Sequence, residues 1–164
     1  MSDPAHGQGA RAGKSPVLLV VCTANVCRSP VAAALLQRRL SHWTVMSAGI
    51  ECISGQLVST EMERLMMQRG IDLRHHRSQK LTLIHLQRTE RVLVMTQGHL
   101  DEIGRRFPQY ASKIDLLGHF QGVQIEDPMG LPTRFFEMAL RQIELATETW
   151  ANALIAPPPS VEKS

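Results

Sequence analysis

Two residues six positions apart, Cys22 and Arg28, carry the first chemical signal in this sequence. A continuous apolar run, residues 16–21, precedes Cys22, and a helix-forming segment opens with Ser29 and Pro30. If the segment between them folds as a cradle, its backbone N–H groups converge at the start of a helix, where amide donors and the helix dipole bind anions. The same field favours the thiolate of Cys22, the nucleophilic form of cysteine. The planar guanidinium of Arg28 matches two oxygens of a phosphoryl group.

This arrangement predicts phosphoryl transfer through a cysteinyl-phosphate. We expect Ser29 to hydrogen-bond the Cys22 thiolate and to ease its departure when the intermediate is hydrolysed. The leaving group needs a proton, and Asp127 is the best candidate acid, because an Asp-Pro pair in a glycine-flanked loop keeps the carboxyl out of a helix. For an isolated cysteine and arginine at this spacing, a packed core thiol is the alternative interpretation. The strand before Cys22, the helix after Arg28 and the Asp-Pro pair favour catalysis.

The elements that must position these residues alternate between strand and helix. Strands are expected at residues 16–21, 44–46, 91–95 and 114–117, and helices at residues 31–40, 59–69, 99–106 and 132–154. Ser29 is expected to cap the first helix, with Pro30 at its first position. This alternation predicts an α/β fold with a parallel sheet covered by helices on both faces. Ligands bind such sheets at the carboxyl ends of the strands, where the Cys22 loop would lie.

Composition restricts the class of protein. The 164 residues suit one domain, which we place at residues 15–156, between flexible tails at residues 1–14 and 157–164. Lys and Arg are scattered, the net charge is only +3, and aromatic residues make up 4% of the chain, so no nucleic-acid partner is expected. Without a secretory signal or a long apolar run, we expect a cytoplasmic protein with no membrane insertion. No residue cluster has metal-ligand spacing, so no metal is expected.

The string VCTANVCRSP, residues 21–30, resembles the phosphate-binding loop of the low-molecular-weight protein tyrosine phosphatases. Weaker matches follow in order: Ser47-Ala48-Gly49, Gly70-Ile71 with His75, residues 92–95, and IEDP at residues 125–128. The resemblance covers nearly the whole folded chain. Residues 113–128 look most like the bacterial branch of the family. That branch pairs with tyrosine autokinases that control capsule and exopolysaccharide export.

The resemblance implies a three-layer α/β fold: a four-stranded parallel sheet flanked by helices on both faces, with the phosphate-binding loop after the first strand and no cofactor. It makes Cys22 the nucleophile, Arg28 the phosphate clamp and Asp127 the general acid. It also makes Asn25 the residue that holds the strained loop, with Ser47 and His75 as loop support. The implied phosphate-binding loop contains Thr23, Ala24, Asn25, Val26, Cys27 and Ser29.

Two apolar residues, Val26 and Met129, are implied as the wall against the substrate ring. Tyrosine-specific members carry a branched apolar residue at the Val26 position, whereas phosphoarginine-specific relatives carry threonine. Four residues depart from the family pattern: Ala24 for Gly, Ala33 for Glu, Met129 for an aromatic, and Cys52 near a loop that often supplies another aromatic. A positive φ at residue 24 would strain an alanine, the missing Glu removes one member of the network around the loop, and Met129 cannot stack on a ring.

Several alternatives stay open. Cys27 either serves as redox partner of Cys22, forming a protective disulfide, or packs as a thiol. The expected function is hydrolysis of phosphotyrosine in a phosphorylated protein, with a tyrosine autokinase as one candidate partner and phosphate or another oxyanion in the site. A phosphotyrosine-binding module without turnover is the alternative, although a binder has no need of Asp127. An arsenate reductase of the same fold is disfavoured, because it needs a cysteine pair far downstream and none follows Cys52.

Overall fold

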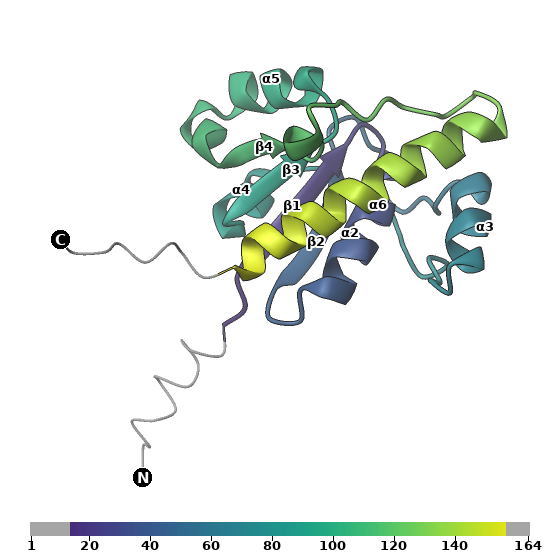
Figure 1. The fold of residues 1–164 in the computed structure, drawn as a ribbon. Helices are drawn as coiled ribbons and strands as arrows, with labels where there is room; N and C mark the ends of the chain where they lie inside the picture. Colours follow the sequence, from purple (N-terminus) through teal and green to yellow (C-terminus); the bar gives the residue numbers. More distant parts are fainter. Residues whose placement is uncertain (1–13, 157–164) are drawn as a thin grey trace, which may run out of the picture.

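The computed structural model describes residues 14–156, so both predicted tails lie outside the described residues except for Lys14. The middle layer is a four-stranded parallel sheet in the order β2-β1-β3-β4 (Figure 1). The strands are β1 (Val17–Cys22), β2 (Thr44–Gly49), β3 (Arg91–Val94) and β4 (Ile114–Leu116). The predicted fold class, a parallel sheet between two layers of helices, is confirmed.

The central strand β1 explains why the apolar run before Cys22 is continuous. Leu18 and Val20 belong to one apolar cluster, and Leu19 and Val21 belong to another, so alternate side chains pack on opposite faces of the sheet. A parallel strand that is covered on both faces needs apolar residues at every position. Cys22 ends this strand opposite Gly49 of β2.

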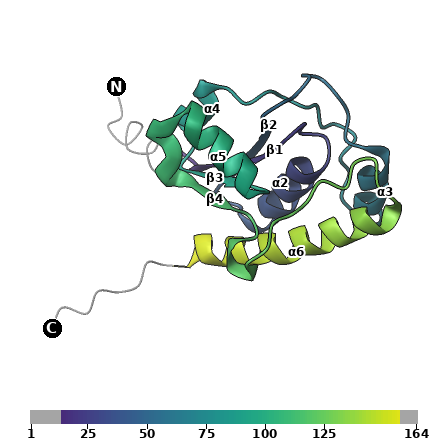
Figure 2. The same cartoon turned by 90° about the horizontal axis from the view of Figure 1, so that it is seen from above.

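The helices divide between the two faces of the sheet. The first layer contains α2 (Arg28–Arg39), α3 (Thr60–Gln68) and α6 (Thr133–Ile155), whose buried side chains share one cluster with those of β1. The opposite layer contains α4 (Leu83–Arg88) and α5 (Gln97–Arg106), with their own cluster. Figure 2 shows the two layers on either side of the strands. Two short 3₁₀ helices, η1 (Pro108–Lys113) and η2 (His119–Gln121), flank β4.

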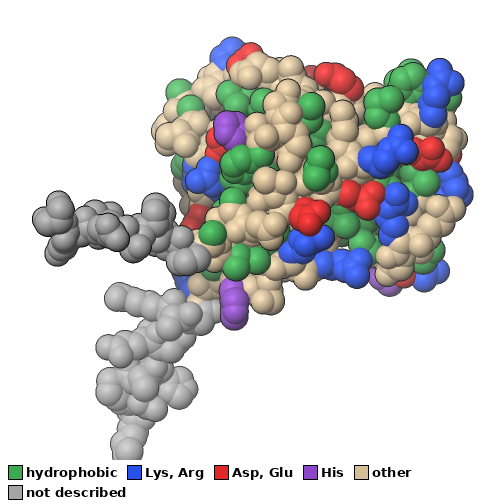
Figure 3. Space-filling view, viewed as in Figure 1, with side chains coloured by type: hydrophobic (Ala, Val, Ile, Leu, Met, Phe, Trp, Pro, Cys, Tyr) green, Lys and Arg blue, Asp and Glu red, His purple; other side chains and the backbone are tan. Residues whose placement is uncertain are grey.

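Charged side chains of both signs are interspersed on the face shown in Figure 3. One ion pair connects helices of the first layer: Arg69, the C-cap of α3, bonds Glu144 of α6 at 3.1 Å. Among the described residues, no helix is long and apolar enough to cross a membrane.

One prediction about local structure was wrong, and one helix was missed. The helix after the loop begins at Arg28, with Cys27 as its N-cap, so Ser29 does not cap it. The reason is that the Ser29 hydroxyl is engaged by Cys22 and Asn25. The helix α4 was not predicted from the sequence. Its signal is a capping box in which Thr82 accepts from the backbone of His85 and the His85 ring accepts from the backbone of Thr82.

Candidate active site

The loop that follows β1 ends directly at the N-terminus of α2 and forms the base of a small hollow. Its lining residues are Cys22, Ala24, Val26, Cys27, Arg28, Asp127 and Met129. Cys22 and Arg28 are almost fully buried, with 2% and 3% of their surface exposed. The structure thus brings together the three predicted catalytic residues and both predicted wall residues, although Asp127 and Met129 are about 100 positions away in the sequence.

The sulfur of Cys22 lies 3.0 Å from the hydroxyl oxygen of Ser29. That hydroxyl accepts a hydrogen bond from Asn25 Nδ2 at 2.8 Å, and its own proton has two acceptors within reach, the Cys22 sulfur and, at the longer distance of 3.5 Å, the backbone oxygen of Ala48. A donated hydrogen bond stabilises a thiolate relative to a thiol. Ser29 therefore lies where it can support Cys22 both as nucleophile and as leaving group.

The loop turns at Asn25, which is the only non-glycine residue with positive φ (58°) among the described residues. Asparagine tolerates this left-handed conformation better than most residues. The Asn25 side chain is fully buried and makes three hydrogen bonds: Nδ2 donates to Ser29 and to Ser47 (3.0 Å), and Oδ1 accepts from the backbone of Gln79 (2.9 Å). Ala24 does not have a positive φ, so the strain considered for that position is absent.

The support of the loop differs from the prediction at one residue. His75 is exposed, and it is the half-buried neighbour His76 whose Nε2 donates to the backbone oxygen of Asn25 at 2.8 Å. The prediction of His75 as loop support was therefore wrong. Burial lowers the pKa of His76, which favours the neutral ring. Gln79 was missed altogether, and it also donates from its side chain to the backbone oxygen of Ser47 at 2.8 Å.

Both terminal nitrogens of the Arg28 guanidinium make hydrogen bonds, but its Nε does not. Nη1 donates to the backbone oxygen of Ile125 at 2.9 Å, and Nη2 donates to Thr23 Oγ1 at 3.3 Å. The buried Nε has no hydrogen-bond partner among the described residues. A buried donor without an acceptor costs about 1–3 kcal/mol, so an oxyanion in the hollow would satisfy Nε.

Asp127 lies at the mouth of the hollow, 47% exposed. Its Oδ2 is 3.7 Å from Arg28 Nη2, and its Oδ1 accepts a hydrogen bond from the backbone of Met129 at 3.0 Å. This turn fixes the carboxyl in the loop before α6, where it can reach both solvent and a bound ester. Met129 itself is 45% exposed and places an apolar side chain beside the opening.

The environment of Cys27 favours a protonated thiol and not a nucleophilic thiolate. Burial, together with the nearby Cys22 and Asp127, raises the pKa of the Cys27 thiol to about 12. Cys22, Cys27 and Cys52 are all free in this structure, so Cys27 packs here as a thiol. Within residues 14–156, no three His, Cys, Asp or Glu side chains are grouped so that they could hold a metal ion.

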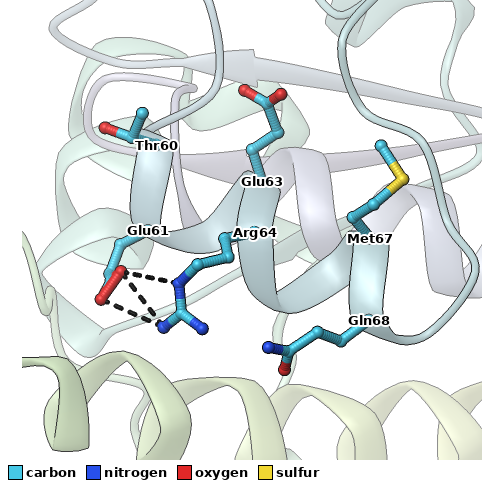
Figure 4. A pocket seen from close by; sticks show the side chains of 6 residues that line it. All are labelled: Thr60, Glu61, Glu63, Arg64, Met67 and Gln68. Atoms are coloured by element: carbon cyan, nitrogen blue, oxygen red, sulfur yellow. Dashed lines mark hydrogen bonds and ion pairs between the residues drawn. The ribbon is translucent and has the colours of Figure 1, made fainter.

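A second hollow lies over the exposed side of α3 (Figure 4). Glu61 and Arg64 pair within it at 3.3 Å, and Glu61 also accepts a hydrogen bond from Thr133 of α6. Glu61 and Arg64 are therefore paired, whereas Glu63 makes no such contact among the described residues. Unlike the Cys22 hollow, it contains no nucleophile and no buried donor that lacks a partner.

Comparison with known proteins agrees with this geometry. The probable low molecular weight protein-tyrosine-phosphatase EpsP of Ralstonia solanacearum is 38% identical over 139 residues, which cover 85% of this chain and 96% of that protein. The structure of the tyrosine phosphatase Wzb from Escherichia coli K30 with sulphate superposes with a TM-score of 0.82 at 31% identity, covering 86% of this chain and 99% of that chain. The structure of the YwlE arginine phosphatase from Geobacillus stearothermophilus superposes with a TM-score of 0.80 at 36% identity, covering 85% of this chain and 92% of that chain.

The match to a family model covers nearly all of the described chain. Residues 17–157 match the model for low molecular weight phosphotyrosine protein phosphatase. This range includes both the Cys22 loop and Asp127. The chain belongs to the low molecular weight phosphotyrosine protein phosphatase family.

Proposed function

We propose that this protein hydrolyses phosphotyrosine in proteins through a cysteinyl-phosphate intermediate. The observation that carries the proposal is the contact of Cys22 sulfur with Ser29 in a hollow that also contains the unsatisfied Nε of buried Arg28. A nucleophile and an anion site therefore coincide. Asp127 at the mouth of the same hollow supplies the acid that a pure binding module does not need.

The first chemical step forms the S–P bond. The phosphoryl oxygens bind to the loop amides and to Arg28, and the Cys22 thiolate attacks phosphorus on the side opposite the ester oxygen. The P–O bond to the phenol breaks, and Asp127 gives its proton to the leaving oxygen. The products are the phosphocysteine, a neutral phenol and the Asp127 carboxylate.

The second step hydrolyses the phosphocysteine. The Asp127 carboxylate takes a proton from a water molecule, and the water oxygen attacks phosphorus. The S–P bond breaks, and the electron pair returns to Cys22 as a thiolate, which Ser29 stabilises by its hydrogen bond. Inorganic phosphate leaves, and Asp127 is again protonated for the next cycle.

The apolar walls of the hollow favour a substrate in which the phosphoryl group is attached to a phenyl ring, as in phosphotyrosine. Val26 and Met129 are both apolar and line the opening. Burying an aromatic ring against such apolar groups is favourable. A tyrosine autokinase is our candidate for the protein substrate, on the resemblance to the bacterial branch, and we place the enzyme in the cytoplasm.

The test is a turnover assay on purified protein at pH 5–7. We expect hydrolysis of p-nitrophenyl phosphate and of a phosphotyrosine peptide, competitive inhibition by vanadate, and far slower release from phosphoserine and phosphoarginine substrates. Cys22→Ser should abolish turnover, and Asp127→Asn should lower kcat about 10²- to 10⁴-fold. Asp101→Asn, at an exposed carboxyl of α5, is the matched control.

Each failure has a distinct meaning. Vanadate binding without turnover by the wild type would replace the proposal with a binding module. Preferential release from phosphoarginine would overturn the substrate assignment. Equal rates for the wild type and Cys22→Ser would sink the cysteinyl-phosphate mechanism.

A further inference from the structure

His99 is a buried imidazole next to the site that the proposed mechanism does not use. It is the third residue of α5, in the helical layer opposite α2, and only 9% of its surface is exposed. Its Nε2 lies 2.9 Å from Thr23 Oγ1, whereas the buried Nδ1 has no partner among the described residues. Within residues 14–156, the ring therefore makes its one polar contact with Thr23, the residue that follows Cys22.

The Thr23 hydroxyl connects this ring to the phosphate clamp. Its oxygen accepts a hydrogen bond from Arg28 Nη2 at 3.3 Å, so His99 is two hydrogen bonds away from the guanidinium. We propose that His99 is a positioning residue, which fixes the Thr23 hydroxyl and thereby holds Arg28 with its Nε–Nη2 edge toward the phosphoryl oxygens. The inference rests on the proposed function of the Cys22 hollow.

Arg28 needs such a partner because two acceptors compete for Nη2. The backbone oxygen of Ile125 fixes Nη1, so the guanidinium can still rotate about that anchor. Asp127 Oδ2 already lies within ion-pair distance of Nη2, at 3.7 Å, and a closer approach would draw Nη2 toward the mouth of the hollow and occupy the acid. A Thr23 hydroxyl held by His99 opposes that rotation.

The environment keeps the ring neutral, as this role requires. Burial and, to a lesser degree, the charge of Arg28 lower the pKa of His99 to about 4, against the opposite effect of Asp127. Its place in the first turn of α5 also disfavours a positive charge. A neutral ring can share a proton with Thr23 and does not compete with Arg28 for the phosphate.

The position of α5 is fixed independently of this contact. Thr96 caps the helix by accepting from the backbone of His99, a bond that any residue at position 99 can make. A substitution of the side chain therefore tests the contact with Thr23 while keeping the cap. His99→Gln places an amide near the location of Nε2, and His99→Leu removes the polar contact.

The experiment measures kcat/KM for p-nitrophenyl phosphate and the affinity for vanadate in the single variants, in Thr23→Val and in the double variant. We expect His99→Leu to lower both by about tenfold, the effect of one hydrogen bond, and His99→Gln to recover most of the loss. If His99 acts through Thr23, adding His99→Leu to Thr23→Val has no further effect.

Wild-type values in His99→Leu, or losses that multiply in the double variant, would overturn the inference. Should His99→Leu fail to fold, ¹⁵N NMR of the wild-type imidazole decides. We expect vanadate to shift the Nε2 signal in the wild type and not in Thr23→Val, and no shift in the wild type would refute the positioning role. A wild type that binds vanadate without turnover fails the proposed function, whereas the binding and NMR measurements still test His99.

Discussion

The conformation of the phosphate-binding loop depends on Asn25, and replacing it gives a prediction whose size follows from the structure. Asn25→Ala removes three buried side-chain hydrogen bonds, to Ser29, Ser47 and Gln79. At about 1 kcal/mol each these account for about 3 kcal/mol. An alanine at φ 58° adds about 1 kcal/mol of backbone strain. We expect a total loss of about 4 kcal/mol, a large part of the roughly 5–15 kcal/mol that stabilises a domain.

Urea denaturation in phosphate-free buffer measures this loss, and Asn25→Gly separates its two causes. Glycine elsewhere is less stable than alanine by about 0.5–1 kcal/mol, but at a left-handed position we expect the order to reverse. Asn152→Ala, at an exposed position of α6, is the matched control and should change stability by less than about 0.5 kcal/mol.

Two outcomes would refute the reasoning. An Asn25→Ala variant within 1 kcal/mol of the wild type would show that the three bonds do not hold the loop. An alanine variant more stable than the glycine variant would show that the left-handed backbone is not under strain. Either result would also weaken the argument that Asn25 prepares the amides for an oxyanion.

Three further predictions concern neighbouring residues. Gly49→Ala should lower the free energy of unfolding by about 1–3 kcal/mol in urea denaturation and should lower kcat/KM, because the new Cβ would lie 2.7 Å from the backbone oxygen of Thr23 in the loop. Gly104→Ala, where a Cβ meets open space, is the control and should neither destabilise the protein nor lower kcat/KM. Iodoacetamide at pH 7 should label Cys22 and spare Cys27, whose pKa is about 12, as peptide mass spectrometry would show; equal labelling contradicts this. The depressed pKa of His99, about 4, means that the unfolded chain is protonated first as pH falls below 6.5. Between pH 7 and pH 4 the wild type should therefore lose about 2 kcal/mol more than His99→Gln, and parallel curves would contradict the assignment.

The sequence was most informative where neighbouring residues act together. The apolar run, the cysteine, the arginine and the helix that follows are contiguous, so local patterns indicate β1, the loop and the start of α2. The fold class follows because alternating strands and helices pack in few ways. The approach of Asp127 to Arg28 could also be predicted, since both lie at carboxyl ends of parallel strands or in the loops that follow them.

The supporting residues could not be predicted with the same certainty. Choosing between His75 and His76 requires the path of a loop to a precision of one residue, and the sequence contains no periodic pattern there. Gln79 contributes a backbone N–H as well as its side chain, and a backbone contact leaves no mark on residue type. His99 is 76 positions from its partner and lies on the opposite helical layer, so no spacing connects it with the nucleophile.

The departures from the family pattern have unequal consequences once the contacts are known. Ala24 does not have the positive φ that would demand glycine, and Ala33 packs against the apolar cluster under α2. The loop is instead held by hydrogen bonds from His99 in the opposite helical layer and from His76 and Gln79. Neither alanine side chain could make such hydrogen bonds. Met129 is different, because it lies half exposed at the opening through which the proposed substrate would enter. We therefore expect substitutions at the base of the hollow to change the rate of the reaction, and substitutions at its mouth to change which phosphorylated side chain is preferred.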